Sequence, residues 1–490
     1  MTSFAGSLAL VAVAISLFWG VGYVAVRALM APRPRSERIG WGFAAGSALV
    51  AAATALTFAL GLKSAWLAFA VLAVLALFAG VRFPVRAASE PTAPRAGRRL
   101  RLPEAFWAAA AVLGVLLYAF HALTEPMWAG DFLAIWGLKG KSFFGAAGFV
   151  RHLFEDAAFG FTHPEYPVGL PLLYAGIGLA VKAWDDHAMA LIFPCFLAAT
   201  LLVLYGFLRR RGATAPVALA ATALLANFQG LYSAFLTGMA EVPLALAFLL
   251  LATSLADAWD ARGDGAMRRV AAASFLAAAT KNEGLLLIGL GLLMTWALFW
   301  IGRTRARVGR LSLAMLAPAV FCAILHRVAF GNHPLRDFDL ALLGSPELPA
   351  RFAAGLKFFF SLHVWPQWAG LLLLAGLLLA GRSVPAANRM LILCAAAVAI
   401  YLALPALAVQ GPEWLATWSL GRTVSALAPI AAAAVALRLS ADQAATGSGL
   451  LMGLDESPLG LGRRGATGSA GGPTACGGGP ARARPSTRAS

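Results

Sequence analysis

Charged residues are scarce in this sequence, and that scarcity excludes an ordinary water-soluble globular protein. Only 12% of the residues are Asp, Glu, Lys or Arg, whereas soluble domains carry about 25%. Hydrophobic residues make up 60% of the 490 positions, and apolar runs near membrane-spanning length recur along most of the chain. We therefore expect the lipid bilayer to be the solvent of this protein.

Other patterns are missing as well. The four cysteines show no CxxC or Cys/His spacing, so neither a zinc site nor a disulfide framework is indicated; they are Cys195, Cys322, Cys394 and Cys476. The apolar runs do not alternate with polar residues, which excludes barrel strands. No internal repeat of the kind found in many transporters is visible. The first apolar run, 4–29, lacks a basic start and a small-residue cleavage site and is expected to be a span.

The net charge of +17 does not indicate a nucleic-acid partner. Most of the basic residues lie in short loops between apolar segments, which is the topology signal of membrane proteins. We therefore predict an all-α, polytopic protein of the inner (plasma) membrane with about 13 transmembrane helices. The predicted spans are 4–30, 41–62, 64–81, 104–123, 188–208, 214–235, 240–256, 269–283, 285–301, 311–330, 367–381, 390–408 and 418–437.

The arginine-rich loops fall on one side if every predicted span crosses the bilayer. The positive-inside rule assigns that side to the cytoplasm, with the N-terminus outside and the C-terminus inside. These loops contain Arg33–Arg38, Arg82–Arg101, Arg209–Arg211, Arg262–Arg269, Arg303–Arg310 and Arg382–Arg389. If the apolar segment Val168–Trp184 were a span, every later loop would lie on the opposite side of the membrane, and the cluster Arg209–Arg211 would be outside. We therefore predict an interfacial or re-entrant helix there.

Three regions are expected along the chain. Residues 1–103 hold three N-terminal helices and a basic, Pro-containing linker that together look like an added module. Residues 104–437 form the working membrane core. Residues 438–490 are rich in Gly, Ala, Ser, Pro and Arg and are expected to be a disordered cytoplasmic tail.

With this topology, ionisable residues gather on the outer side of the core. Charges at membrane depth are costly, so they are candidates for function, although internal ion pairs are a common alternative. The candidates are Asp131, His163, Glu165, Tyr166, Glu241, Lys281, Asn282, Glu283, His363 and Arg422. His326 and Arg327 lie near the same surface and His363 lies in an outer loop, and for these three residues we favour a structural or solvated role.

Several candidates admit a purely structural explanation. Asp131 precedes the stretch 133–144, an expected amphipathic interfacial helix, and could simply cap it. Glu241 at a helix start is favoured by the helix dipole. Lys281 and Glu283 could pair to close a helical hairpin, and Arg422 could be a snorkelling interfacial arginine.

A stiff, proline-rich motif, H-P-E-Y-P-V-G-L-P, presents His163, Glu165 and Tyr166 close together. It could also be a rigid turn with solvated side chains. His163 and Glu165 could hold a divalent metal together with Asp131, but the spacing is not a known ligand pattern, so no cofactor is firmly predicted.

Taken together, these residues resemble the GT-C glycosyltransferases over 104–437. The resemblance is to the bacterial protein mannosyltransferase-like, aminoarabinose-transferase-like and Rgt-type enzymes. Asp131 matches the family's catalytic carboxylate, and Lys281 its lysine near the lipid phosphate. The stretch 163–173 is similar to its Pro-rich motif, although this chain reads Y-P-V-G-L-P where P-P-L is usual. Arg422 matches a late basic residue.

The resemblance implies transfer of a sugar from a polyprenyl-phosphate donor to an acceptor on the outer face, with inversion. Asp131 would be the general base, and the acceptor would be a glycan, lipid or protein. A transporter or lipid flippase that uses the same charges as a substrate path is the alternative from another class. A non-enzymatic assembly subunit is a third possibility.

Overall fold

The computed structural model describes residues 3–29, 33–62, 70, 71, 74, 78, 101–260, 265–304, 307–333, 337–359 and 384–452. Residues 1–444 form one unit and residues 445–490 a second. The helices are α1 Phe4–Leu29, α2 Arg35–Ala59, α4 Leu102–Thr124, α5 Gly137–Ala146, α6 His152–Glu155, α7 Gly169–Val181, α8 Asp186–Met189, α9 Ile192–Arg210, α10 Ala215–Ala226, α11 Glu241–Trp259, α12 Ala266–Thr280, α13 Asn282–Trp300, α14 Val308–Phe330, α15 Leu348–Phe359, α17 Pro385–Ala403, α18 Pro412–Leu415, α19 Gly421–Ser425 and α20 Ala428–Met452.

The prediction of a helical, multi-pass membrane protein is confirmed at that level. Within the described residues, nine helical segments are long and apolar enough to cross a membrane. They are Phe4–Arg27, Arg35–Ala59, Leu102–Thr124, Asp186–Arg210, Glu241–Trp259, Asn282–Trp300, Val308–Phe330, Pro385–Leu407 and Gly421–Ala441. The count of 13 spans stays a prediction, as does the GT-C-like arrangement.

Four predicted spans differ from these nine. The segment 367–381 and nearly all of 64–81 lie outside the described residues, as does most of the 82–101 linker. The segments 214–235 and 269–283 correspond to α10, with 12 residues, and α12, with 15 residues. At 1.5 Å per residue these helices are roughly 18 and 23 Å long, shorter than a bilayer core of about 30 Å. The helix α20 continues through an Ala-rich stretch to Met452, so the tail predicted as disordered from 438 begins as helix.

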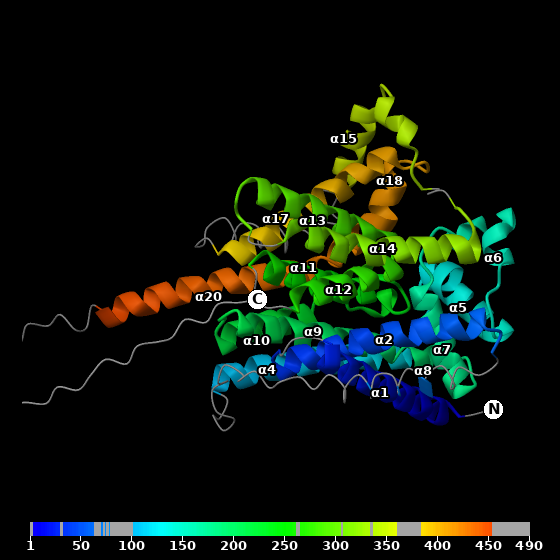
Figure 1. Cartoon of the computed structure of the whole chain (residues 1–490), viewed down its shortest axis with the longest axis horizontal. Helices are drawn as coiled ribbons and strands as arrows, with labels where there is room; N and C mark the ends of the chain where they lie inside the picture. The colour runs from blue at the N-terminus through cyan, green and yellow to red at the C-terminus, as the bar shows by residue number, and fades with distance from the viewer. Residues whose placement is uncertain are drawn as a thin grey trace, which may run out of the picture. The chain divides into compact units, whose positions relative to one another are not determined.

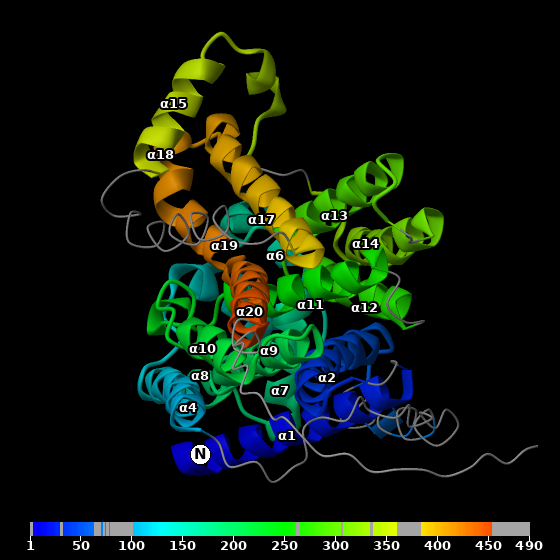
Figure 2. The same ribbon diagram turned by 90° about the vertical axis from the view of Figure 1, so that its left-hand side faces the viewer.

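The central element is α11, which packs against α2, α9, α12, α13, α17 and α19 (Figures 1 and 2). All of its residues are buried. Its sequence contains many alanines together with Thr253 and Ser254, and such small residues let neighbouring helices approach closely. Glu241 stands at one end of this buried helix and Asp257 near the other, so α11 carries a carboxylate into each end of the bundle.

The helix α2 packs against α1 on one side and against α7 and α9 on the other (Figure 1). The hairpin of α1 and α2 is tight because glycines face each other. A Cβ at Gly22 would lie 2.0 Å from the Gly42 carbonyl oxygen, and one at Gly46 would lie 2.1 Å from the Phe18 carbonyl oxygen. Gly42 and Gly46 have the spacing of the GxxxG helix-packing motif.

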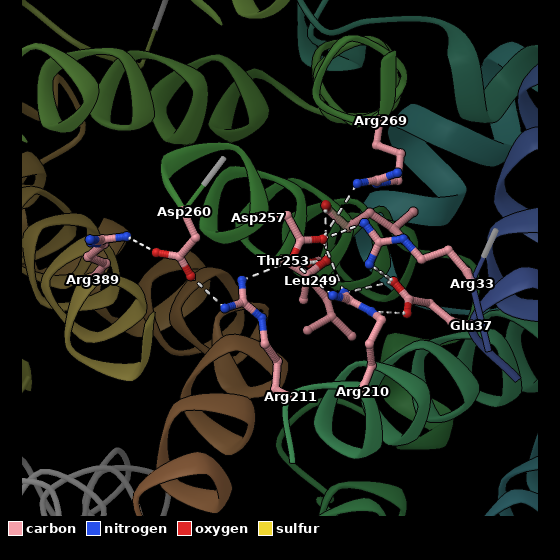
Figure 3. A network of polar contacts seen from close by, with 11 residues as sticks. Arg33, Glu37, Arg210, Arg211, Leu249, Thr253, Asp257, Asp260, Arg269 and Arg389 are labelled. Atoms are coloured by element: carbon pink, nitrogen blue, oxygen red, sulfur yellow. Dashed lines mark hydrogen bonds and ion pairs between the residues drawn. The ribbon is translucent and has the colours of Figure 1, made fainter. Parts of the chain in front are cut away.

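A buried network of arginines and carboxylates ties the start of α2 to the core (Figure 3). Arg33 and Glu37 pair with residues at the ends of α9 and α11, and the carboxylates at the end of α11 also bind arginines at the starts of α12 and α17. The members are Arg33, Glu37, Arg210, Arg211, Asp257, Asp260, Arg269 and Arg389. The Arg303 carbonyl oxygen accepts from Arg389, so residues of most of the predicted cytoplasmic loops meet at one end of the bundle.

The segment after α4 packs into the protein more deeply than expected. A π-helical turn over Phe132–Trp136 leads into α5, which packs against α7. On α5 Lys139 is fully buried and Lys141 is exposed, so the helix lacks the solvated basic face of the expected amphipathic interfacial helix. With 13 residues, α7 is too short to cross a bilayer and is almost wholly buried. That burial fits the re-entrant alternative for Val168–Trp184 better than the interfacial one.

Candidate functional site

The first part of the candidate site joins Asp131 to the start of α11 through Arg422. Arg422 Nη1 lies 2.9 Å from Asp131 Oδ2 and 3.9 Å from Glu241 Oε1. Asp131 does not cap the following helix, because its backbone is already helical and its carboxylate accepts no capping hydrogen bond. The capping explanation is therefore wrong. Asp131, with 28% of its side chain exposed, faces a guanidinium group instead.

Packing beside Asp131 fixes this carboxylate near α11. The Phe132 ring lies 2.8 Å from where a Cβ at Gly238 would be, and Gly238 has a φ of +94°, which favours glycine. Tyr174 Oη donates to the Gly238 carbonyl oxygen at 2.9 Å. A larger residue at position 238 would therefore displace the turn that carries Asp131.

Lys281 holds two carboxylates of the same cluster. Its Nζ lies 3.0 Å from Glu241 Oε1 and 2.8 Å from Glu283 Oε1, and only 3% of the Lys281 side chain is exposed. The extended Lys281 separates α12 from α13, and Gly284 follows where a Cβ would lie 2.0 Å from the Ala277 carbonyl oxygen. The expected hairpin pair of Lys281 and Glu283 is present, and it reaches a third helix through Glu241.

The second part of the site is a group of three metal-ligating side chains. His163 Nδ1 lies 2.9 Å from Glu165 Oε1 and 3.6 Å from Asp337 Oδ2. Ligand atoms of these three residues lie within 4.8 Å of one another. His163 has a φ of 51°, a left-handed conformation that costs about 1–3 kcal/mol for a non-glycine residue. This strain has to be offset by the contacts that hold the imidazole.

Aromatic stacking and two hydrogen bonds orient this second cluster. The Tyr166 ring stacks on His163 at 4.8 Å and on Trp136 at 5.4 Å. Lys139 Nζ donates to the His163 carbonyl oxygen at 2.7 Å. Asn282 Nδ2 donates to the Glu165 carbonyl oxygen at 3.5 Å, which connects this cluster to the α12–α13 turn. The two parts of the candidate site are therefore neighbours.

Burial and opposite charges shift the pKa values in the second cluster. Burial lowers the pKa of His163, but the hydrogen bond to Glu165 and the charge of Asp337 outweigh it and raise the pKa. For Glu165, burial raises the pKa, but the His163 hydrogen bond, a backbone hydrogen bond and the positive charges of His163 and Lys139 together lower it by more. Burial raises the pKa of Asp337 and lowers that of Lys139 to about 7. An imidazolium–carboxylate pair at His163 and Glu165 follows.

A cavity of about 1000 Å³ adjoins these residues. Its walls come from α2, α7, α11, α12, α13 and α14, and most of the lining is apolar. Polar lining residues include Arg151, Glu165, Asn282, His326, Arg327 and His333. Glu165 thus belongs both to the metal-ligating group and to the cavity wall. The volume suits a long apolar chain with a polar head.

The structure brings together most of the residues expected from the sequence. Asp131, Glu241, Lys281, Glu283 and Arg422 form one connected set of ion pairs. His163, Glu165, Tyr166 and Asn282 form the adjoining set. His363 lies outside the described residues.

Other residues differ from expectation. The three-residue metal-ligating group that the structure shows takes Asp337 where the sequence suggested Asp131. No local pattern marks Asp337. His326 and Arg327, for which a structural or solvated role was expected, line the cavity, and a ring nitrogen of His326 lies 2.9 Å from the Pro164 carbonyl oxygen.

No protein-family model, curated protein or solved structure was found that matches this chain.

Proposed function

We propose that this protein is a membrane glycosyltransferase that moves a sugar from a polyprenyl-phosphate donor to an acceptor hydroxyl or amine. The observation that carries the proposal is the apolar cavity of about 1000 Å³ whose wall includes Glu165 and Asn282. A lipid-linked sugar needs an apolar groove for its chain and polar groups at one end. The buried carboxylates and cations of the neighbouring cluster supply groups for chemistry at such an end.

The proposed chemistry assigns the base to Asp131. Its carboxylate takes the proton from the acceptor, whose oxygen or nitrogen then attacks the anomeric carbon. The bond from that carbon to the phosphate oxygen breaks, the electron pair leaves with the lipid phosphate, and the configuration inverts. Arg422, 2.9 Å from Asp131, orients the carboxylate and offers a guanidinium to the departing phosphate.

Lys281 has a different part in this proposal. Both of its carboxylate partners lie within 3.0 Å, and its side chain is 3% exposed, so its charge is already compensated. We assign it as a positioning residue that holds Glu241 close to Arg422. Arg151 and Arg327 at the cavity wall are exposed, so they can meet a phosphate without first breaking a buried pair.

The test uses the full chain in nanodiscs with a panel of polyprenyl-phosphate sugars, followed by mass spectrometry. Asp131→Asn should lower turnover by about 10²–10⁴-fold, the usual worth of a general base, and retain donor binding. Glu125→Gln is the matched control, because Glu125 is exposed and lies in the same connecting segment outside the cluster. Equal turnover in the two variants would refute the assignment of Asp131.

A lipid flippase or transporter is the second candidate, favoured by the same cavity, which helices from distant parts of the chain line together. A transporter moves its substrate unchanged. Loss of a labelled lipid from one leaflet, with no donor consumed and no sugar released, would favour it over the transferase. If the protein shows no sugar turnover and moves no lipid, that result would favour a non-enzymatic assembly subunit.

A further inference from the structure

The spacing of three side chains beside the cavity matches the coordination sphere of a divalent cation. Metal–ligand bonds to imidazole nitrogen and carboxylate oxygen are about 2.0–2.2 Å long, which places neighbouring ligand atoms roughly 2.9–3.6 Å apart for bond angles between octahedral and tetrahedral values. His163 Nδ1 lies 2.9 Å from Glu165 Oε1 and 3.6 Å from Asp337 Oδ2. All three ligand atoms lie within 4.8 Å of one another.

Glu165 carries an oxygen that no group among the described residues satisfies. Its Oε2 is buried and has no hydrogen-bond partner among the described residues, and its side chain is 3% exposed. Leaving a buried carboxylate oxygen without a partner is costly. An ion bound by this carboxylate would remove that cost, which points to a ligand at this position.

The balance of charge around the site also favours a cation. The carboxylates of the two adjoining clusters are Asp131, Glu165, Glu241, Glu283 and Asp337, and the Lys and Arg cations are Lys139, Lys281 and Arg422. A metal ion binds the neutral form of imidazole, so in the metal-bound site five carboxylates would face three Lys and Arg cations, an excess of two negative charges among the described residues of the two clusters. One divalent cation supplies the missing positive charge.

We propose that His163, Glu165 and Asp337 bind a divalent cation. One imidazole and two carboxylates suit an ion of intermediate hardness such as Mn²⁺ or Zn²⁺. Tyr166, stacked between His163 and Trp136, holds the imidazole in place for the ion. Three protein ligands leave coordination positions open, and Glu165 also lines the cavity. An anionic head group can fill those positions; this last role rests on the proposed function, whereas the metal site does not.

The experiment measures binding of Mn²⁺ to the full chain in nanodiscs after treatment with EDTA. Electron paramagnetic resonance of free Mn²⁺ during a titration should show one tight site in the wild type. Asp337→Asn should weaken that site by about tenfold or more. Asp339→Asn is the matched control, because this exposed carboxylate lies two residues away and accepts a bond from the Ala341 N–H instead. It should bind as the wild type does.

Two further measurements keep the result unambiguous. The unfolding temperature of each variant shows whether it is folded, and His163→Gln provides a second ligand deletion if Asp337→Asn unfolds. No tight site in the wild type, or equal Mn²⁺ affinity in the Asp337 and Asp339 variants, would overturn the proposal. Tight Mn²⁺ binding without sugar transfer would refute the proposed function and still support the metal site. A tight Mn²⁺ site together with sugar transfer that persists after EDTA treatment would support both the metal site and the transferase. It would also show that the ion is not required for the transfer reaction.

Discussion

Replacing Asp257 with asparagine should destabilise the protein by about 3–5 kcal/mol, the usual cost of removing one partner of a buried ion pair. Asp257 is 1% exposed and stands at the centre of the network in Figure 3. Its carboxylate contacts Arg33, Arg210, Arg211 and Arg269. Asparagine keeps the shape and removes the charge, so the variant leaves four guanidinium groups facing a neutral amide.

The structure predicts a different cost at each member of the network. Asp260 has 19% of its side chain exposed and pairs with Arg211 at 2.6 Å and Arg389 at 2.5 Å. Water can partly replace those contacts, so Asp260→Asn should cost about 1–2 kcal/mol. Arg269 lies 3.6 Å from Asp257, and its buried Nε and Nη1 have no hydrogen-bond partner among the described residues. Arg269→Met should therefore be neutral or stabilising.

The assay is thermal unfolding of the purified variants in nanodiscs of one lipid composition. Asp257→Asn should unfold at the lowest temperature, Asp260→Asn between it and the wild type, and Arg269→Met at or above the wild type. An Asp257→Asn midpoint equal to that of the wild type would show that the pairing does not stabilise the fold. A fall in the unfolding temperature of Arg269→Met as large as that of Asp257→Asn would refute the argument from the unsatisfied nitrogens of Arg269.

Two further predictions concern close packing and the cavity. Gly284→Ala should lower the unfolding temperature strongly, because its Cβ would lie 2.0 Å from a backbone oxygen of α12, whereas Gly289→Ala on the same helix has nothing within 4 Å and should not. Ala55→Trp, which fills the cavity wall on α2, should abolish binding of a fluorescent polyprenyl phosphate. Leu17→Trp on the exposed face of α1 should leave that binding unchanged, and equal binding by both tryptophan variants would argue against the cavity as the lipid site.

The membrane class and the basic loops could be predicted because both depend on composition along the chain. Apolar runs of spanning length mark the helices, and arginines between them mark the loops of one side. The network in Figure 3 agrees with this pattern, since Arg33, Arg210 and Arg269 from three predicted cytoplasmic loops meet at Asp257. Arg389 from a fourth such loop pairs with Asp260 on the same side of the network. The lengths of short helices such as α10 and α12 were harder to predict, because an apolar run does not reveal where its helix ends.

The site could be predicted only where its residues lie close together in the sequence. The motif with His163 and Glu165 brings its own side chains together through prolines, and the structure shows that pair at 2.9 Å. Asp337 joins them from a distant segment without any local signal. The pairing of Asp131 with Arg422 likewise depends on how α19 packs against α11. Such partners are brought together by tertiary packing, and no local sequence pattern indicates which distant residues will meet.

The two clusters at the ends of α11 carry opposite excess charge, and this bears on how the protein lies in the membrane. Glu241 and Asp257 are sixteen residues apart on α11, about 24 Å along the axis, close to the thickness of a bilayer core. The helix dipole favours Glu241 at the N-terminal end and disfavours Asp257 near the C-terminal end. The arginines around Asp257 offset that disadvantage.

The network in Figure 3 has five arginines, Arg33, Arg210, Arg211, Arg269 and Arg389, against three carboxylates, Glu37, Asp257 and Asp260, an excess of two positive charges. The two adjoining clusters around Glu241 have five carboxylates against four cations when His163 is charged, an excess of one negative charge among the described residues. The positive-inside rule places an end rich in arginine in the cytoplasm. We therefore propose that the end with Asp131, the proposed cation site and Glu241 faces outward, the side on which the lipid-linked donor would be used.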